Sequence, residues 1–132
     1  MNIWLVTIGE PIPVGFGVKD RLLRTGSFAF FLAEKGHDVT WWTSDFDHFR
    51  KKHYCNEDTK LNLKDHLKIY LIHGRGYKNN ISLRRILDHR LIARRFAKLV
   101  RLEARKPDII VASLPTIDLS LESVKYGQEF KI

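Results

Sequence analysis

The sequence contains very little cysteine and no long hydrophobic run, and both shortages exclude classes of protein. Its single cysteine, Cys55, rules out an intramolecular disulfide and is typical of a reducing compartment. The N-terminal apolar run is too short for a signal-peptide core and lacks a basic flank and a small-residue cleavage site, so we expect a cytoplasmic protein. With 132 residues, 44% hydrophobic and 29% charged, we expect one folded domain, or part of one, and not a disordered chain.

The chain also has fewer acidic than basic residues, and most of the difference lies in one segment. The chain carries a formal net charge of +8, and the segment 82–106 contains nine basic residues against two acidic ones. Such a patch attracts anionic lipid, nucleic acid or a phosphorylated substrate. The basic face has no interleaved aromatic residues and the chain has no nucleic-acid-binding motif, so we do not expect nucleic acid as a partner.

The pattern at the N-terminus predicts one strand–helix–strand unit. Residues 2–8 form a short apolar run that suits a strand buried on both faces, Gly36 ends a helix, and residues 38–43 resume the strand pattern. Two strands joined by a helix predict an α/β fold with a parallel sheet and helices on both faces. Ligands of such sheets bind beyond the carboxyl ends of the strands, so we expect function in the loop 9–19.

The rest of the chain continues this alternation after a polar stretch. Residues 44–64 show no clear period and predict a loop or a short helix. We then expect a strand at 67–72 and a turn at His73-Gly74-Arg75-Gly76. A helix should run from the N-cap Ser82 to about Ala104, with a bend or break at 89–91. The remaining elements expected are a strand at 108–112, a helix from 117 that Gly127 ends, and the start of a strand at 130–132. A domain that stops at the start of its fifth strand predicts the N-terminal piece of a longer protein.

The loop after the first strand contains two glycines, Gly15 and Gly17. It does not match the dinucleotide-binding fingerprint, because Asp20 stands where the third glycine belongs, and it lacks the lysine and hydroxyl pair of a P-loop. Backbone amides freed by these glycines, together with the next helix N-terminus, predict a place for a diphosphate. The other interpretation is that the glycines only let the chain turn.

A polar segment, 43–50, follows the second strand. Asp45 occupies the position where a nucleotide-binding sheet often carries its ribose-binding acid. We expect no metal here, because the one cysteine has no partner and the spacing of the other candidate ligands matches no usual pattern; these are Asp45, Asp47, His48 and His53. The segment predicts a polar substrate loop, or else a surface loop with a capping side chain.

Ser113 follows the strand at 108–112. No histidine and carboxylate stand at a spacing that defines a nucleophile triad, and the glycine–serine–glycine pattern of a nucleophile elbow is absent. We therefore interpret Ser113 as a hydrogen-bonding group or as a helix cap before Pro115.

The second half of the long helix has cations at helical spacing on the side away from its apolar residues, namely Arg94, Lys98, Arg101 and Arg105. A charged helix face is commonly only solvated. The functional interpretation is that this face holds the domain against anionic lipid, at about 1 kcal/mol per charge.

Several stretches of the chain together form a recognisable pattern. They are the opening strand with its proline and glycine loop, Arg21-Leu22-Leu23-Arg24-Thr25-Gly26, residues 32–40 with Lys35-Gly36-His37-Asp38-Val39-Thr40, Thr43-Ser44-Asp45-Phe46-Asp47-His48-Phe49, and residues 107–113 and 126–132. Across the whole chain this pattern resembles the N-terminal domain of family 4-like glycosyltransferases, and bacterial enzymes of surface-polysaccharide biosynthesis most of all. The segment 35–40 is common to many such transferases, whereas 43–49 is more selective.

The resemblance implies the GT-B architecture, in which two Rossmann-like domains face each other and the nucleotide-sugar donor binds mainly to the C-terminal one. This chain would be the acceptor-side half of an enzyme that glycosylates a glycan or lipid-linked acceptor at the inner membrane face, without a catalytic metal or other cofactor. Gly15 and Gly17 would approach the donor diphosphate, and three residues would face the acceptor: Arg21, Asp45 and His48. Ser113 stands where many relatives have a histidine, so no catalytic residue is assigned.

Two other classes of protein stay open. An NAD-type oxidoreductase domain would use Asp45 for the ribose, and it predicts saturable binding of a dinucleotide. A non-enzymatic basic domain would dock on anionic membrane, and it predicts vesicle binding that depends on the basic helix face.

Overall fold

A computed structural model describes residues 1–14 and 21–132 of the chain. The elements in this part follow in the order β1 (Asn2–Val6), α1 (Arg24–Glu34), β2 (Asp38–Ser44), β3 (Phe46–Asp47), β4 (Lys52–His53), β5 (Thr59–Lys64), β6 (Leu67–Ile72), α2 (Leu83–Leu102), β7 (Ile109–Ala112) and α3 (Ile117–Phe130). The protein is therefore mixed α/β, as predicted.

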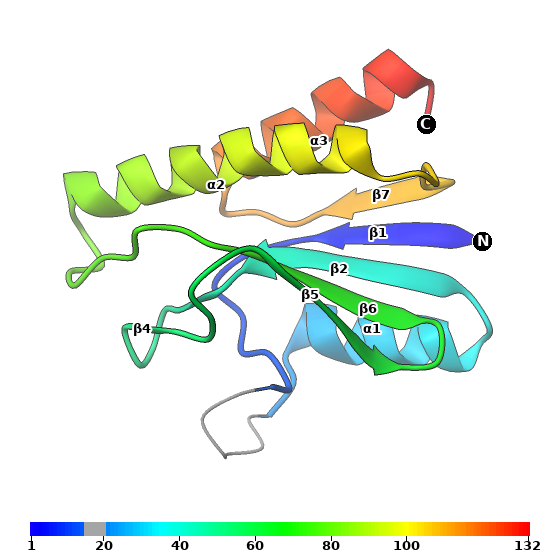
Figure 1. Ribbon diagram of the computed structural model, residues 1–132, viewed down its shortest axis with the longest axis horizontal. Helices are drawn as coiled ribbons and strands as arrows, with labels where there is room; N and C mark the ends of the chain where they lie inside the picture. The colour runs from blue at the N-terminus through cyan, green and yellow to red at the C-terminus, as the bar shows by residue number, and fades with distance from the viewer. Residues whose placement is uncertain (15–20) are drawn as a thin grey trace.

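Among the described residues, five strands form one mixed sheet in the order β5–β6–β2–β1–β7 (Figure 1). β6, β2, β1 and β7 are parallel, and Leu5 of β1 lies opposite Trp41 on one side and Val111 on the other. β5 pairs with β6 in the antiparallel direction. The prediction of a purely parallel sheet is thus wrong at this edge strand. The four parallel strands still bring their carboxyl ends to one edge, where polar loops gather.

Helices cover both faces of the sheet, α1 on one face and α2 with α3 on the other (Figure 1). Successive side chains of a strand point to opposite faces, so Ile3 and Leu5 of β1 pack in the core beneath α1, whereas Trp4 and Val6 pack against α2 and α3. Trp4 stacks on Tyr126 of α3 with ring centres 5.3 Å apart. Burial on both faces explains the continuous apolar run in this strand.

The segment expected to be a loop or a short helix contains β5. Its residues alternate between half-buried and exposed, and Leu61 and Leu63 pack against the core on the α1 side. Period-2 alternation of this kind is the pattern of an edge strand with one face in water. The loop prediction for residues 59–64 is therefore wrong.

The C-terminal residues 130–132 do not start a strand. α3 continues past Gly127 to Phe130, and Lys131 ends it in the left-handed conformation at φ 57°. The ring of Phe130 lies 4.5 Å from that of Tyr126, centre to centre, so the last helical turn is part of the core. The predicted end at Gly127 and the predicted fifth strand are both wrong.

The long helix begins where the sequence predicts and has no break. The Ser82 hydroxyl accepts a hydrogen bond from the Arg85 backbone N–H at 3.2 Å, and α2 is continuous from Leu83 to Leu102. Phe96 in the second half is fully buried, whereas Leu83 in the first half is 78% exposed. The two apolar stripes therefore coexist on one continuous helix. Neither α2 nor any other helix in the described residues is long and apolar enough to cross a bilayer.

Candidate functional site

A polar cleft of about 220 Å³ opens at the carboxyl edge of the sheet. Its walls come from the segments that follow β1, β2, β6 and β7 and from the first turns of α2, with the lining residues Ile8, Gly9, Ser44, Phe46, His48, Tyr77, Arg85, Asp88, His89, Pro115 and Thr116. This is the edge at which the sequence predicts ligand binding, because the loops that follow the parallel strands converge there. Of the predicted acceptor-binding residues, His48 lines the cleft.

His48 and Tyr77 form the centre of one wall. His48 Nδ1 and Tyr77 Oη are hydrogen-bonded at 2.8 Å. Lys51 Nζ lies 4.9 Å from the centre of the Tyr77 ring, and the Arg85 guanidinium carbon lies 5.8 Å from it. Partial burial, followed by the positive charges of Lys51 and Arg85, lowers the pKa of His48. The imidazole is therefore neutral near pH 7 and able to accept a proton.

His89 brings a second imidazole to the same cleft from α2. Its ring centre lies 6.0 Å from that of Tyr77. Burial is the main cause that lowers the pKa of His89, and the Arg85 charge adds to it, while Asp88 acts in the opposite direction. Arg85 and His89 are one helical turn apart, so they present a cation and a neutral imidazole from one face of the helix.

Thr116 closes the cleft at the start of α3. The residue is 4% exposed, and among the described residues its hydroxyl has no hydrogen-bond partner. It is the N-cap residue of α3, yet its side chain makes no capping hydrogen bond. A buried hydroxyl without a partner costs about 1–3 kcal/mol, so it marks a place where a polar ligand group is stabilising.

The loop at residues 73–76 places Tyr77, and Asp88 holds this loop through hydrogen bonds. The buried Asp88 carboxylate accepts hydrogen bonds from the backbone N–H of Arg75 at 2.6 Å and of Gly76 at 2.9 Å. A Cβ at Gly74 would lie 2.5 Å from Asp88 Oδ1, and Gly76 has φ +69°. The predicted end of the strand at Ile72 is confirmed, but residues 73–76 form an irregular loop and not the predicted turn, and this loop needs both glycines for space or conformation.

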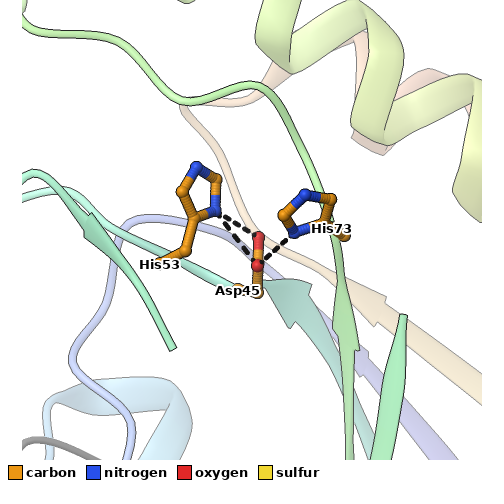
Figure 2. A group of neighbouring side chains, drawn as sticks. All are labelled: Asp45, His53 and His73. Carbon is orange, nitrogen blue, oxygen red and sulfur yellow. Dashed lines mark hydrogen bonds and ion pairs between the residues drawn. The ribbon is translucent and has the colours of Figure 1, made fainter. Parts of the chain in front are cut away.

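Asp45 lies beside the cleft but inside the protein. It is entirely buried, and its carboxylate accepts hydrogen bonds from His73 Nδ1 at 2.6 Å, His53 Nδ1 at 3.0 Å and the Gly74 N–H at 3.2 Å. Figure 2 shows both imidazole rings directed at this one carboxylate. The structure therefore joins Asp45 to His73, a residue that the sequence analysis assigned only to a turn.

Asp47 organises the β3–β4 hairpin that carries His48. Its carboxylate accepts hydrogen bonds from the Phe49 and Arg50 backbone N–H groups at 2.8 Å and 2.7 Å and from the Tyr54 hydroxyl at 2.7 Å. Burial acts to raise the pKa of Asp47, but these hydrogen bonds outweigh it and lower the pKa. The polar segment 43–50 therefore contains a capping side chain, Asp47, and also reaches the cleft through His48.

Two predicted site residues, Arg21 and Ser113, do not line the cleft. Arg21 is exposed, and Ser113 donates its backbone N–H to the Val6 carbonyl at 2.9 Å. Gly15 and Gly17 lie outside the described residues. The structure therefore leaves the predicted diphosphate contact of the two glycines as a prediction.

A carboxylate of the chain itself occupies the described part of the α1 N-terminus. Glu10 accepts hydrogen bonds from the Thr25 backbone N–H at 2.9 Å and from the Thr25 hydroxyl at 2.8 Å. Anions are stabilised at helix N-termini, so Glu10 takes a place that the sequence analysis assigned to a phosphate.

The four cations predicted to face a membrane differ in their surroundings. Arg94 and Lys98 are exposed on α2. Arg101, also on α2, forms an ion pair with Glu129 of α3, and Arg105, beyond the end of α2, forms one with Asp38 at 2.7 Å. The predicted continuous face of four charges is thus a pair of exposed cations followed by two that carry their own counter-ions.

The sequence analysis missed four cleft residues, namely Tyr77, Arg85, His89 and Thr116. A signal was present for two of them, because Tyr77 and Thr116 each follow a predicted strand by a short turn. Arg85 and His89 were assigned only to a basic helix, since nothing local says which helix end meets the strand tips.

No protein-family model matches this sequence, and no curated protein is significantly similar to it. What the site does must therefore be argued from its own geometry and chemistry.

Proposed function

We propose that this chain is the N-terminal, acceptor-side domain of a GT-B-type glycosyltransferase, which moves a sugar from a nucleotide-sugar donor to a glycan or lipid-linked acceptor. The observation that carries the proposal is the polar cleft at the strand ends, with the unpartnered hydroxyl of Thr116 in its wall. The sequence resemblance adds support, because its more selective segment, 43–49, supplies His48 to this cleft.

The chemistry of the cleft suits a hydroxyl-rich ligand. Tyr77 and Thr116 offer hydroxyl groups that both donate and accept, and His48 offers a neutral imidazole, so the cleft matches the mixed donors and acceptors of a sugar ring. Its volume of about 220 Å³ is below the roughly 300–1,000 Å³ of a complete small-molecule site. A site for one sugar ring, completed by a facing donor domain, accounts for this size.

His48 and His89 are the groups suited to receive a proton from an acceptor hydroxyl. Both have a lowered pKa and are therefore in the basic form near pH 7. In the proposed enzyme, catalysis comes from bringing the acceptor hydroxyl close to the anomeric carbon of the donor. The Arg85 guanidinium in the same wall would offset negative charge on the departing nucleoside diphosphate.

The dinucleotide-binding alternative has less support. It requires the Asp45 carboxylate to accept hydrogen bonds from a ribose, but that carboxylate is entirely buried and already accepts three from His53, His73 and Gly74. A ribose would have to displace these donors.

The test is an NMR titration of the isotope-labelled chain with methyl glycosides of several hexoses and, separately, with NAD⁺. We expect at least one glycoside to bind, with millimolar affinity, and to shift the amide signals of His48, Tyr77 and Thr116. NAD⁺ should produce no saturable shift. Saturable NAD⁺ binding, or glycosides that leave the cleft signals unmoved, would contradict the proposal.

A pair of matched variants makes the test sharper. Thr116→Val removes the unpartnered hydroxyl, so we expect unchanged or higher stability but glycoside binding weaker by roughly tenfold. Ser123→Ala removes a buried hydroxyl of the same helix that donates to the Leu119 carbonyl and does not line the cleft, so it should leave glycoside binding unchanged. Equal glycoside affinity in wild type and Thr116→Val would remove Thr116 from the site.

A further inference from the structure

Three potential metal ligands from separate segments converge beside the cleft (Figure 2). Asp45 directly follows β2, His53 ends β4, and His73 directly follows β6. Their ligand atoms all lie within 4.8 Å of one another. Imidazole nitrogen and carboxylate oxygen are the ligands that zinc and similar first-row divalent cations prefer.

The geometry of the cluster is close to that of a zinc site. His53 Nδ1 and His73 Nδ1 lie 3.0 Å and 2.6 Å from the same atom, Asp45 Oδ2. A tetrahedral zinc with bonds of about 2.0–2.1 Å holds neighbouring ligand atoms about 3.3–3.4 Å apart. To hold the ion, the two imidazole–carboxylate distances must lengthen by less than about 1 Å, and the separation of the two imidazole ligand atoms, which is within 4.8 Å, must change by at most about 1.5 Å.

The surroundings fix the ligands and leave a way in from solvent. The Asp45 side chain is entirely enclosed, whereas those of His53 and His73 are 28% and 29% exposed. A Cβ at Gly76 would lie 2.9 Å from His53 Nε2, so the glycine leaves room for the imidazole, and the hydrogen bond to Asp45 orients its Nδ1 inward. A preoriented carboxylate behind two reachable imidazoles is an arrangement that a metal ion can enter without unfolding the protein.

We infer that Asp45, His53 and His73 bind a zinc-class divalent cation, with water in the fourth position. Cys55 is not in the ligand set, although its thiol lies 3.7 Å from Asp45 Oδ2, because the thiol donates to the Glu57 carbonyl at 3.1 Å. The sequence analysis expected no metal because the ligands in 45–55 alone match no pattern. The third ligand, His73, comes from the end of another strand.

The ion would fasten together the loops at this edge of the sheet. A two-stranded hairpin such as β3–β4 is marginally stable alone, and the ion would fasten its last residue, His53, to the ends of β2 and β6. The same hairpin carries His48 into the cleft. His53 and His73 do not line the cleft, so the ion would shape the site without touching a ligand in it. This inference does not depend on the proposed transferase function.

The test begins with the wild-type chain after dialysis against a chelator. Titration with Zn²⁺ in a calorimeter should show one site with micromolar or tighter affinity, and Co²⁺ should give the visible absorption of a tetrahedral site. Zn²⁺ in excess should raise the melting temperature by several degrees, because a ligand that binds only the folded state stabilises it. No binding at equimolar Zn²⁺, or an octahedral Co²⁺ spectrum, would overturn the inference.

The decisive variants are His53→Asn and His73→Asn. An asparagine amide stands near the position of Nδ1 and keeps a hydrogen bond to Asp45, but it is a poor zinc ligand. We expect each variant to fold in chelator and to lose at least roughly tenfold in zinc affinity. Zinc affinity equal to that of wild type in both variants would show that the cluster is only hydrogen-bonded.

Two control variants separate this site from other ways of holding zinc. His66→Asn alters a pair in which His66 Nδ1 lies 2.8 Å from Asp38 but no third ligand is present among the described residues, so zinc affinity should not change. Cys55→Ser should also bind zinc as wild type does. Loss of zinc in Cys55→Ser with retention in His73→Asn would assign the metal to the thiol and overturn the proposed ligand set.

Discussion

At the scale of single residues, three buried aspartates organise the carboxyl edge of the sheet. Asp45, Asp47 and Asp88 each accept hydrogen bonds from backbone N–H groups of the surrounding loops. A buried carboxylate is costly unless it is fully hydrogen-bonded, so each one selects a single loop conformation. His48 and Tyr77 owe their places in the cleft to these loops.

The close approach of the loop at 73–76 to Asp88 yields a prediction for Gly74→Ala. The added Cβ would lie 2.5 Å from Asp88 Oδ1 and 3.0 Å from Ile92 Cδ1, so the free energy of unfolding should fall by about 1–3 kcal/mol. Urea denaturation measures it. Gly127→Ala is the matched control, because its Cβ would meet nothing closer than 3.6 Å in a helix, and it should stabilise by about 0.5–1 kcal/mol. A neutral Gly74→Ala would show that the turn does not pack as described.

At the scale of elements, the single continuous helix α2 contributes residues to the cleft, to the core and to the basic surface. Its first turns bring Arg85 and His89 to the cleft, its second half buries Phe96 in the core, and its outer surface exposes Arg94 and Lys98. In the proposed transferase, this basic helix surface would suit an acceptor that is anchored in an anionic membrane. Only cations without a counter-ion nearby are expected to contribute much to such binding.

We therefore predict that Arg94→Gln with Lys98→Gln weakens binding to anionic phospholipid vesicles. Each basic residue near such a surface contributes about 1 kcal/mol, so the loss of two corresponds to roughly 30-fold in vesicle partitioning. Flotation or sedimentation with vesicles measures it. Arg101→Gln with Arg105→Gln removes the same net charge, but these cations pair with Glu129 and Asp38, so the effect should be smaller. Equal effects would mean that only net charge matters, and no effect from either pair would exclude the membrane interaction.

At the scale of the whole molecule, stability depends on the pH because the cleft holds imidazoles in their neutral form. The pKa values of His48 and His89 are lowered from the value of 6.5 expected in an unfolded chain. Between the lowered values and 6.5, the unfolded chain binds more protons than the folded protein, so stability rises with pH in this window and falls as the pH is lowered through it. Above this window the two histidines contribute no pH dependence.

The corresponding prediction concerns the double variant His48→Gln with His89→Gln. Between pH 7.5 and 5 the free energy of unfolding of the wild type should fall, and the variant should show a smaller fall because two groups that take up protons on unfolding are gone. Urea denaturation at a series of pH values gives both slopes. Identical slopes for the two proteins would contradict the lowered pKa values.

Elements with a strong local pattern were predictable. The strand at Leu67–Ile72 has the bounds that the sequence predicts, because a short apolar run, interrupted only by the exposed Lys68, identifies a strand without its partners. The edge strand at Thr59–Lys64 was missed, although its residues alternate, because a short half-exposed strand differs little from a polar loop. Phe130 was mistaken for the start of a strand, although it lies four residues after Tyr126, on which it packs, and this spacing is helical.

By itself the sequence determined the alternation of strands and helices, the helices on both faces and the edge at which polar residues gather. These follow from hydrophobic period and from the connections between parallel strands. Only the tertiary structure decided which polar side chains meet. His53 and His73 belong to different strand ends yet share Asp45, and Thr116 is left without a partner only after folding, because such contacts depend on strand order and register.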